Sequence, residues 1–465
     1  MKTLFVLFLA LALGSAACAP QPPRFPTPTP IPTETPLQRS SAPLSESLLL
    51  ARHLSDKDVT VLTAIDPANG AELAGITPLS IRQTDLYAVS PDRKSLAMIG
   101  YPSSTYPHSP HLYLIDLQDW SLRTLDLPLD DWVSQMAYAS DNRSLAIATA
   151  QVESRVVVID TARATVTAQG KLDFYVRQMK FDTHPTGLMF YGVPMEPSYG
   201  TTSGDPVVAL VRTADWASLW TARLPGLRDG LYSKSGQLNA DLHTPGQAYS
   251  FVPGLAFAPE NDLLYIANAE KDELLYVDFA ARSIQTRPIH TEESWLDQLL
   301  APGVAHAKGA DGNQKNAVVS PDGKFLYING THNEFSNDKD GNPQFLQTPL
   351  GLQVIRTADA VQVSRINSAA NDLTLTADGK FAYLHVWNTS GPVTDVLDIQ
   401  QGRVIASLPG LVLIPIRRLN GDPLLVSAYN SNGVSTTLAV FRPGTTLPLS
   451  SWPVPDYAEW IVIPQ

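Results

Sequence analysis

Short apolar segments separated by turn residues recur along most of the chain. In the clearest copy, Ala317–Gly330, two apolar segments flank the sequence Ser-Pro-Asp-Gly-Lys. A second copy, Leu373–Leu384, has Ala-Asp-Gly-Lys at the same place, and looser copies begin at Val89, Tyr138 and Phe257. Proline fixes φ, aspartate accepts hydrogen bonds from nearby backbone, and glycine adopts positive φ. The pattern therefore predicts two strands joined by a tight turn.

A third and a fourth strand follow each copy. From His111 the chain reads HLYLIDLQDWSLRTLDLP, an apolar strand that ends near an aspartate, turns, and returns. Similar segments begin at Arg155, Leu274 and Gly351. Each unit thus has four antiparallel strands in about 40–50 residues, which is the period of a propeller blade. We predict an all-β fold, a β-propeller of four-stranded antiparallel blades.

The number of blades follows from the first strands. Seven are recognisable: Leu86–Ser90, Gln135–Ser140, Arg177–Asp182, Gly254–Pro259, Asn316–Pro321, Asp372–Ala377 and Leu411–Ile416. The unit near Leu48–Ile76 has no first strand of its own, and the C-terminal segment Glu459–Pro464 can supply it. Such a strand completes the first blade, closes the ring and removes exposed edges. This count predicts eight blades, and seven is the alternative in which one unit is a loop.

The SPDGK-type turn and its spacing resemble the YVTN-type repeat family. Those propellers are related to the lactonase, quinoprotein amine dehydrogenase and nitrous oxide reductase propellers. The resemblance covers most of residues 46–465. It implies the propeller fold, and it implies no single function, because this fold carries many.

The N-terminus has the pattern of an export signal. A basic start, an apolar run Leu4–Leu13 and small residues lead to Cys18, which predicts a signal peptide over residues 1–17. As a helix, ten residues rise about 15 Å, half of a bilayer core. Cys18 after Ala17 resembles the lipobox of bacterial lipoproteins, whose cysteine is lipidated. Ser15 stands where that family favours leucine, so ordinary secretion is the alternative.

Residues 18–45 form a predicted stalk between this cysteine and the propeller of residues 46–465. The segment Ala19–Ser45 contains nine prolines and favours polyproline II, a semi-rigid spacer. We expect an exported protein that is bound to a membrane through its N-terminal lipid. The lipid would hold it on the outer face of the cell membrane or on the outer membrane.

The overall charge and the cysteine count exclude several functions. The formal net charge of −12 gives no long-range attraction to nucleic acid, so none is expected as a partner. With one cysteine in 465 residues, the chain cannot form an internal disulfide or a cysteine-rich zinc site.

Four segments are too long for plain turns, and we expect them to gather on one face of the ring. They are Pro194–Pro206, Gly226–Ser250, Thr291–Lys315 and Thr331–Pro349. The third begins with a short predicted amphipathic helix, Glu292–Leu300.

The fourth long segment also contains the best metal-like pattern. Asp338, Asp340 and Asn342 alternate around Gly341, and calcium prefers such oxygen ligands. The same sequence is ordinary turn chemistry, and an EF-hand would need a later glutamate and flanking helices. Calcium is therefore one of two interpretations, and no other cofactor is predicted.

Polar residues that flank the best blade are the candidates for a cluster at the mouth of the channel. They are His306, Lys308, Asn316, His332, Asn333 and Glu334. His385 lies within a predicted strand and is expected to be a hydrogen-bonded strand histidine. Six tryptophans in or beside strands are expected to pack between blades: Trp120, Trp216, Trp220, Trp387, Trp452 and Trp460.

Familiar catalytic motifs do not occur in the sequence. It has no HExxH, no GxSxG elbow and no P-loop. We therefore predict a monomeric, non-catalytic binding or scaffold module outside the cytoplasm, with a protein, glycan or small-molecule ligand. The alternative is an extracytoplasmic enzyme resembling lactonases or quinoprotein dehydrogenases.

Overall fold

The computed structural model divides into two compact units, residues 1–38 and 39–465. The fold described below is that of the second unit alone. No helix of the described part is long and apolar enough to span a membrane. The described residues are 39–41, 44, 47–54, 59–82, 86–101, 109–195, 202, 204–233, 248–291, 312–337, 343–370, 372–376, 378–388, 391–415, 424–429, 435–442, 445–453 and 460–462.

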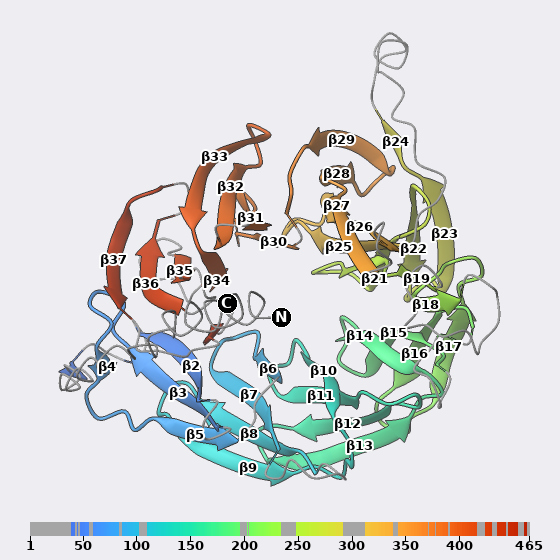
Figure 1. Cartoon of the computed structure of the whole chain (residues 1–465). Coiled ribbons are helices and arrows are strands. Elements are labelled where there is room, and N and C mark those ends of the chain that lie inside the picture. The colour runs from blue at the N-terminus through green and yellow to red at the C-terminus, as the bar shows by residue number, and fades with distance from the viewer. Residues whose placement is uncertain are drawn as a thin grey trace, which may run out of the picture. The chain divides into compact units, whose positions relative to one another are not determined.

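Eight sheets, each built on four antiparallel strands, surround a central axis (Figure 1). Blade 1 combines β38 (Trp460–Val462), β2 (Leu48–Leu54), β3 (Val59–Ile65) and β5 (Leu79–Arg82), with β4 (Glu72–Leu73) and β1 (Arg39–Ser40) added at β3. Blade 2 is β6 (Leu86–Val89), β7 (Ser95–Gly100), β8 (His111–Asp116) and β9 (Leu122–Asp126). Blade 3 is β10 (Val133–Tyr138), β11 (Ser144–Thr149), β12 (Arg155–Asp160) and β13 (Thr165–Lys171). Blade 4 is β14 (Tyr175–Phe181), β15 (Gly187–Val193), β16 (Val207–Arg212) and β17 (Ser218–Arg223).

A separate hairpin lies between blades 4 and 5 in sequence; its strands are β18 (Gly230–Ser233) and β19 (Ala248–Phe251). Blade 5 is β20 (Gly254–Phe257), β21 (Leu263–Ala267), β22 (Glu273–Asp278) and β23 (Ser283–Pro288). Blade 6 is β25 (Asn313–Val319), β26 (Phe325–Asn337), β28 (Leu352–Arg356) and β29 (Val361–Ile366), with β24 (His290–Thr291) and β27 (Pro343–Pro349) added. Blade 7 is β30 (Asp372–Leu375), β31 (Phe381–Asn388), β32 (Gly391–Asp398) and β33 (Arg403–Pro409). Blade 8 is β34 (Leu411–Pro415), β35 (Leu424–Tyr429), β36 (Ser435–Phe441) and β37 (Pro448–Pro453).

The ring closes as predicted, because the C-terminal strand completes the first blade. β38 pairs antiparallel with β2, with Ile461 opposite Ala51. A second closing contact lies at the rim, where Trp452 of blade 8 packs on Gly70 of blade 1. Gly70 has a φ of 73°, and a Cβ there would lie 2.4 Å from the indole ring. The eight-blade count and the all-β class are both confirmed.

Alternation along the middle strands explains why they read as continuous apolar runs. On β11, Leu145 and Ile147 pack in one apolar cluster with blade 2. Ala146 and Ala148, which point the other way, pack in another with blade 4. Because both faces of an inner strand are covered, polar residues are excluded from both. Similar clusters join each of the other consecutive pairs from blade 1 to blade 8.

Three tryptophans of the predicted set form direct contacts between neighbouring blades. The Trp120 indole N–H donates to the Thr77 carbonyl at 2.8 Å. The Trp216 ring covers Gly170 of blade 3, and Trp220 packs edge-on against Phe279 of blade 5, with centroids 5.7 Å apart. Together with Trp452 they confirm packing between blades, while the side chains of Trp387 and Trp460 lie outside the described residues.

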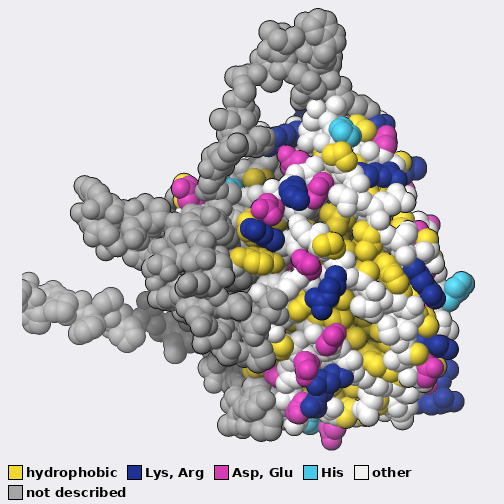
Figure 2. Space-filling model, turned by 90° about the vertical axis from the view of Figure 1, so that its right-hand side faces the viewer, with side chains coloured by type: hydrophobic (Ala, Val, Ile, Leu, Met, Phe, Trp, Pro, Cys, Tyr) yellow, Lys and Arg dark blue, Asp and Glu magenta, His cyan; other side chains and the backbone are white. Residues whose placement is uncertain are grey.

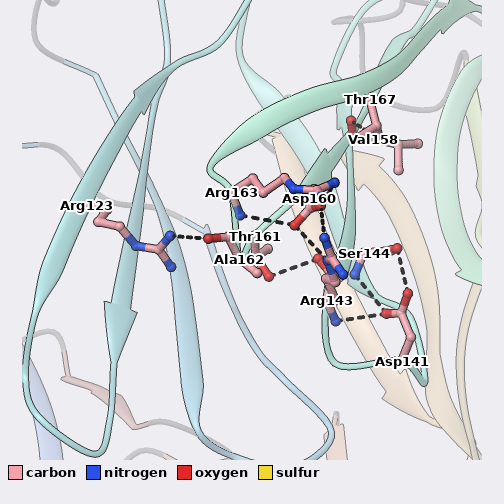
Figure 3. A network of polar contacts seen from close by, with 10 residues as sticks. All are labelled: Arg123, Asp141, Arg143, Ser144, Val158, Asp160, Thr161, Ala162, Arg163 and Thr167. Atoms are coloured by element: carbon pink, nitrogen blue, oxygen red, sulfur yellow. Dashed lines mark hydrogen bonds and ion pairs between the residues drawn. The ribbon is translucent and has the colours of Figure 1, made fainter.

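The repeated turns are held by aspartates, as blade 3 shows (Figure 3). Asp141 accepts hydrogen bonds from the Arg143 and Ser144 amides, each at 2.8 Å. Arg143 then binds Asp160 at the end of the third strand through two hydrogen bonds, of 2.9 and 2.5 Å. Hydrogen bonds from the Arg143 side chain and the Arg163 amide, together with both arginine charges, lower the pKa of Asp160 to about 2, although burial opposes this. The aspartate that ends the third strand thus stabilises the turn between the first and second strands of the same blade.

The turns between first and second strands of neighbouring blades contact one another, which defines one face of the ring as the turn face. Asn142 of blade 3 accepts a hydrogen bond from the Asp92 amide of blade 2 at 2.7 Å. Lys180 of blade 4 donates to the Ala258 carbonyl of blade 5 at 2.5 Å. The first strands therefore begin at the opposite face, which we call the loop face.

The fourth long segment differs from its prediction as a loop. β26 continues to Asn337 and pairs with β27, so that Thr331 lies opposite Pro349 and Asn337 opposite Pro343. Most residues of these paired segments are polar, and they lack the apolar alternation that marks a strand, so the search for apolar strands missed this ribbon.

Candidate functional site

All four long connections are attached to the loop face, and they belong to blades 4, 5 and 6. Two of them join second to third strands, and two join the last strand of a blade to the first strand of the next. Both kinds of connection begin and end at the loop face of a four-stranded blade. The expectation that they gather on one face is confirmed, and it locates the candidate site.

The centre of the site is a buried carboxylate that binds an arginine. Asp229, immediately before β18, is 1% exposed. Its two oxygens accept a hydrogen bond from Arg177 at 2.9 Å and one from the Tyr191 hydroxyl, also at 2.9 Å. Arg177 lies on β14, the innermost strand of blade 4, and its side chain is 34% exposed. Asp229 therefore fixes a partly exposed guanidinium beside the channel.

Burial and charge act in opposite directions on this carboxylate. Burial raises the pKa of Asp229, and the Arg177 charge and the Tyr191 hydrogen bond oppose that rise. Burial and the neighbouring carboxylate also raise the pKa of Tyr191 well above its usual value. Tyr191 therefore stays protonated and acts as a donor.

The chain around Asp229 is held by further polar contacts. Thr202 donates to the Asp229 carbonyl at 2.7 Å, and the Asp229 amide donates to the Tyr232 hydroxyl at 3.0 Å. The next residue, Gly230, has a φ of 114°, and a Cβ there would lie 1.9 Å from the Thr202 hydroxyl. Only glycine permits this close approach.

An open hollow of about 420 Å³ lies beside this centre. Its lining residues are Thr202, Gly204, Asp205, Arg223, Gly226, Leu227, Arg228 and Tyr232. The Arg228 guanidinium stacks near Tyr232 and Phe251, 5.6 and 5.5 Å from the ring centroids. It also lies 3.6 Å from Glu270 of blade 5. The hollow thus has two guanidinium groups and one aspartate in its wall.

The polar contacts continue from Glu270 into blades 5 and 6. Lys315, on the innermost strand of blade 6, is buried and donates to the Asn268 carbonyl at 2.6 Å. Burial lowers the pKa of Lys315, and the Asp272 and Glu273 charges oppose this. Asn268 also accepts a hydrogen bond from the Glu270 amide. Lys315 therefore joins two blades and does not point into open channel.

The structure brings three of the predicted channel-mouth residues into this region. His332 Nδ1 lies 2.8 Å from Asn313 Oδ1, and the Asn313 amide group donates to the Ala269 carbonyl. Asn333 is buried and accepts hydrogen bonds from Thr331 and Gln347. His332 and Asn333 thus brace the hairpin of blade 6. Glu334, the next residue, is exposed.

Asn316 lies on the channel-lining strand β25 and is exposed. The other predicted site residues lie outside the described residues: Cys18, His306, Lys308, Asp338, Asp340 and Asn342, as does the predicted helix Glu292–Leu300. Within the described ranges there is no group of three or more metal-binding side chains.

His385 differs from its expectation as a fully hydrogen-bonded strand histidine. Its Nδ1 lies 3.9 Å from the Asp372 carboxylate, and its Nε2 is buried without a hydrogen-bond partner among the described residues. Burial lowers the pKa of His385, and the Asp372 charge opposes this. The reason is tertiary: the His385 side chain is only 14% exposed, and the Val412 backbone of blade 8 acts on the imidazole together with Asp372 against the effect of burial.

Sequence reasoning missed Arg177, Asp229 and Arg228. Arg177 stood within a predicted first strand, where a charged residue beside the channel was the available signal. Asp229 and Arg228 stood in a polar loop with no spacing pattern, and their roles depend on contacts with blades 4 and 5.

No family model and no curated protein sequence matches the chain. Solved structures do match its fold and place it in the class of β-propellers. A structure of dihydro-heme d1 dehydrogenase NirN in complex with DHE is similar, with a TM-score of 0.53 and 12% identity over 94% of this chain and 82% of that one. Hydrazine synthase of Kuenenia stuttgartiensis gives a TM-score of 0.43 at 11% identity over 79% of this chain and 94% of the other. The β-propeller domain of Myceliophteria thermophila Cps50 (Swd1) gives 0.39 at 11% over 78% and 94%. At these identities the likeness concerns the fold alone.

Proposed function

We propose that the protein is an exported lipoprotein whose propeller binds a small anionic molecule at its loop face. The sequence supports the envelope part through the signal-like residues 1–17, Cys18 and the proline-rich stalk. The YVTN-type resemblance supports the repeat propeller and leaves its function open.

One observation carries the binding part: the loop-face hollow with Arg223 and Arg228 in its wall. Arg223 is exposed, and guanidinium groups bind carboxylates and phosphates through paired hydrogen bonds. Asp205 and Glu270 balance the two guanidinium charges in number, but Glu270 is paired with Arg228 at 3.6 Å. The exposed Arg223 is therefore the group proposed to bind the anion, and the site suits an anion of low charge. The buried Asp229 network fixes the wall next to it.

The alternative of a propeller enzyme would require a carboxylate, a histidine and an arginine to converge at one channel mouth. Among the described residues, Arg177 pairs with Asp229 on the blade 4 side, and His385 pairs with Asp372 in blade 7. Separate pairs of this kind support binding rather than acid–base catalysis.

Calorimetric titration with inorganic phosphate and with succinate tests the binding proposal. We expect saturable binding of at least one anion, and we expect Arg223→Gln to weaken it about tenfold, the worth of one charged hydrogen-bonding group. Arg212→Gln, an exposed arginine at the turn face of the same blade, is the matched control. Equal affinity in wild type and Arg223→Gln would refute the site.

Metabolic labelling with a radioactive fatty acid tests the anchor separately. Wild-type protein should carry label and Cys18→Ala should not. An unlabelled wild-type protein would reject lipidation and leave the binding proposal in place.

A further inference from the structure

A second hollow, of about 290 Å³, lies between blades 5 and 6 and belongs to neither the channel nor the loop-face site. Its walls come from β21, β22 and β23 of blade 5 and from the turn after β28 of blade 6. The outer edge of blade 5, formed by β23, lies on the right-hand side of Figure 1. This side faces the viewer in Figure 2, where charges of both signs are interspersed with hydrophobic side chains. The lining residues are Leu263, Tyr265, Tyr276, Asp278, Ser283, Gln285, Arg287, Thr357 and Ala358.

The register of blade 5 places these side chains in two neighbouring rows on one face of the sheet. Tyr276 pairs with Tyr265 on one side and with Gln285 on the other. Two residues along, Asp278 pairs with Leu263 and Ser283. Residues two apart on a strand share a face, so two tyrosines, a carboxylate, a hydroxyl and an amide converge.

Tyr276 breaks the rule that the other blades follow at its position. The equivalent third-strand residues are apolar in six blades: Leu114, Val158, Leu210, Val354, Val396 and Ala439. These residues complete apolar packing between blades. In blade 5 a phenol replaces them, and its hydroxyl is buried with no hydrogen-bond partner among the described residues. The Tyr276 ring still packs against the apolar cluster between blades 5 and 6, but a buried hydroxyl without a hydrogen-bond partner costs free energy.

Arg287 contacts three other lining residues of the hollow, namely Tyr276, Gln285 and Ala358. Its guanidinium lies 4.6 Å from the centroid of the Tyr276 ring. One nitrogen donates to the Ala358 carbonyl of blade 6 at 2.5 Å, and another donates to the Gln285 side chain at 3.1 Å. The arginine thus holds Gln285 in place, and its charge is balanced by Asp278 in the same wall.

We propose that this hollow binds a single sugar ring of a glycan. Tyr265 is 5% exposed and Arg287 lies over the Tyr276 ring, so the half-buried Tyr276 supplies an apolar surface at the wall rather than a free stacking platform. Carboxylate, amide and hydroxyl groups bind the hydroxyls of a sugar. A volume near 290 Å³ lies just below the range of ligand pockets, roughly 300–1,000 Å³, so it suits a ligand no larger than one sugar ring. The balanced charges favour a neutral ligand over an anion. The inference stands apart from the anion site, because the two sites share no lining residue.

Saturation-transfer NMR on the full-length protein with D-glucose, D-galactose and N-acetyl-D-glucosamine tests the proposal. We expect transfer to at least one sugar, and we expect Gln285→Ala to weaken binding about tenfold through loss of a hydrogen-bonding group. Tyr276→Leu, which restores the residue type of the other blades, should abolish transfer while it preserves or raises thermal stability. Gln169→Ala, an exposed glutamine on the outer strand of blade 3, is the matched control.

No transfer to any of the three sugars would overturn the proposal. Transfer that survives unchanged in both blade 5 variants would also overturn it, because the sugar would then bind elsewhere. Arg223→Gln should leave sugar transfer intact, so failure of the anion site and failure of the sugar site can be distinguished.

Discussion

Gly170→Ala should destabilise the propeller through a single contact between blades. Gly170 lies on β13, and an added Cβ would lie 1.9 Å from two atoms of the Trp216 indole. The glycine has no positive φ, so the effect is steric rather than conformational. The methyl group must displace the ring from its place beside Phe190, where the two centroids are 6.4 Å apart.

The cost follows from what the ring loses. A tryptophan buries about 150–250 Å², and exposing half of that costs about 2–3 kcal/mol at roughly 25 cal/mol per Å². The Trp216 N–H also lies 3.4 Å from the Lys171 carbonyl, a long hydrogen bond that adds little. With an unfolding entropy of roughly 2 cal/mol/K per residue, this corresponds to a fall in Tm of about 3 °C.

Urea unfolding of a double-mutant cycle measures the coupling. Trp216→Gly removes the ring and suits the φ of 56° at that position. In that background Gly170→Ala should cost less than about 0.5 kcal/mol, because alanine is better than glycine in a strand. Gly204→Ala, where the new Cβ would meet its nearest atom at an ordinary 3.4 Å, is the control. If Gly170→Ala lowers the free energy of unfolding equally with and without the Trp216 indole, the contact between Gly170 and Trp216 does not stabilise the propeller.

Three further predictions concern the turns, the closure and the site. Asp160→Asn should cost about 1–2 kcal/mol above pH 5, since it weakens the Arg143 pair. The folded pKa of Asp160 is about 2, below its unfolded value near 3.9, so this stabilisation is complete above about pH 5 and is lost as the pH falls toward 2. The difference between wild type and variant in pH-dependent thermal melts should therefore vanish as the pH falls toward 2. Ile461→Pro should lower the free energy of unfolding by at least about 2 kcal/mol and promote aggregation, because it frees the β2 edge. Thermal melting and gel filtration measure both effects, and a variant that melts at the wild-type temperature would contradict closure by β38. Asp229→Ala should destabilise by about 3 kcal/mol in urea unfolding, because it leaves Tyr191 buried without its acceptor; a change below about 0.5 kcal/mol would contradict the buried network.

The sequence determined the repeat and therefore the fold. Asp-Gly turns, apolar alternation and the aspartate that ends third strands are local signals, and each recurs often enough to count blades. The closure was also readable, because a first blade without an inner strand and a spare C-terminal strand complement each other. The sequence pattern could not locate the ends of the ribbon β26–β27, because most of its residues are polar and lack the apolar alternation of a strand.

The tertiary structure alone decided where the chemistry lies. Arg177 and Asp229 are 52 positions apart, and no spacing rule joins them. Tyr276 is one tyrosine among 16 until the register shows that the other blades place leucine, valine or alanine there. Local patterns specify strands and turns because these depend on neighbours in sequence. The two hollows depend on which side chains the ring brings together from separate blades, and only the folded arrangement contains that information.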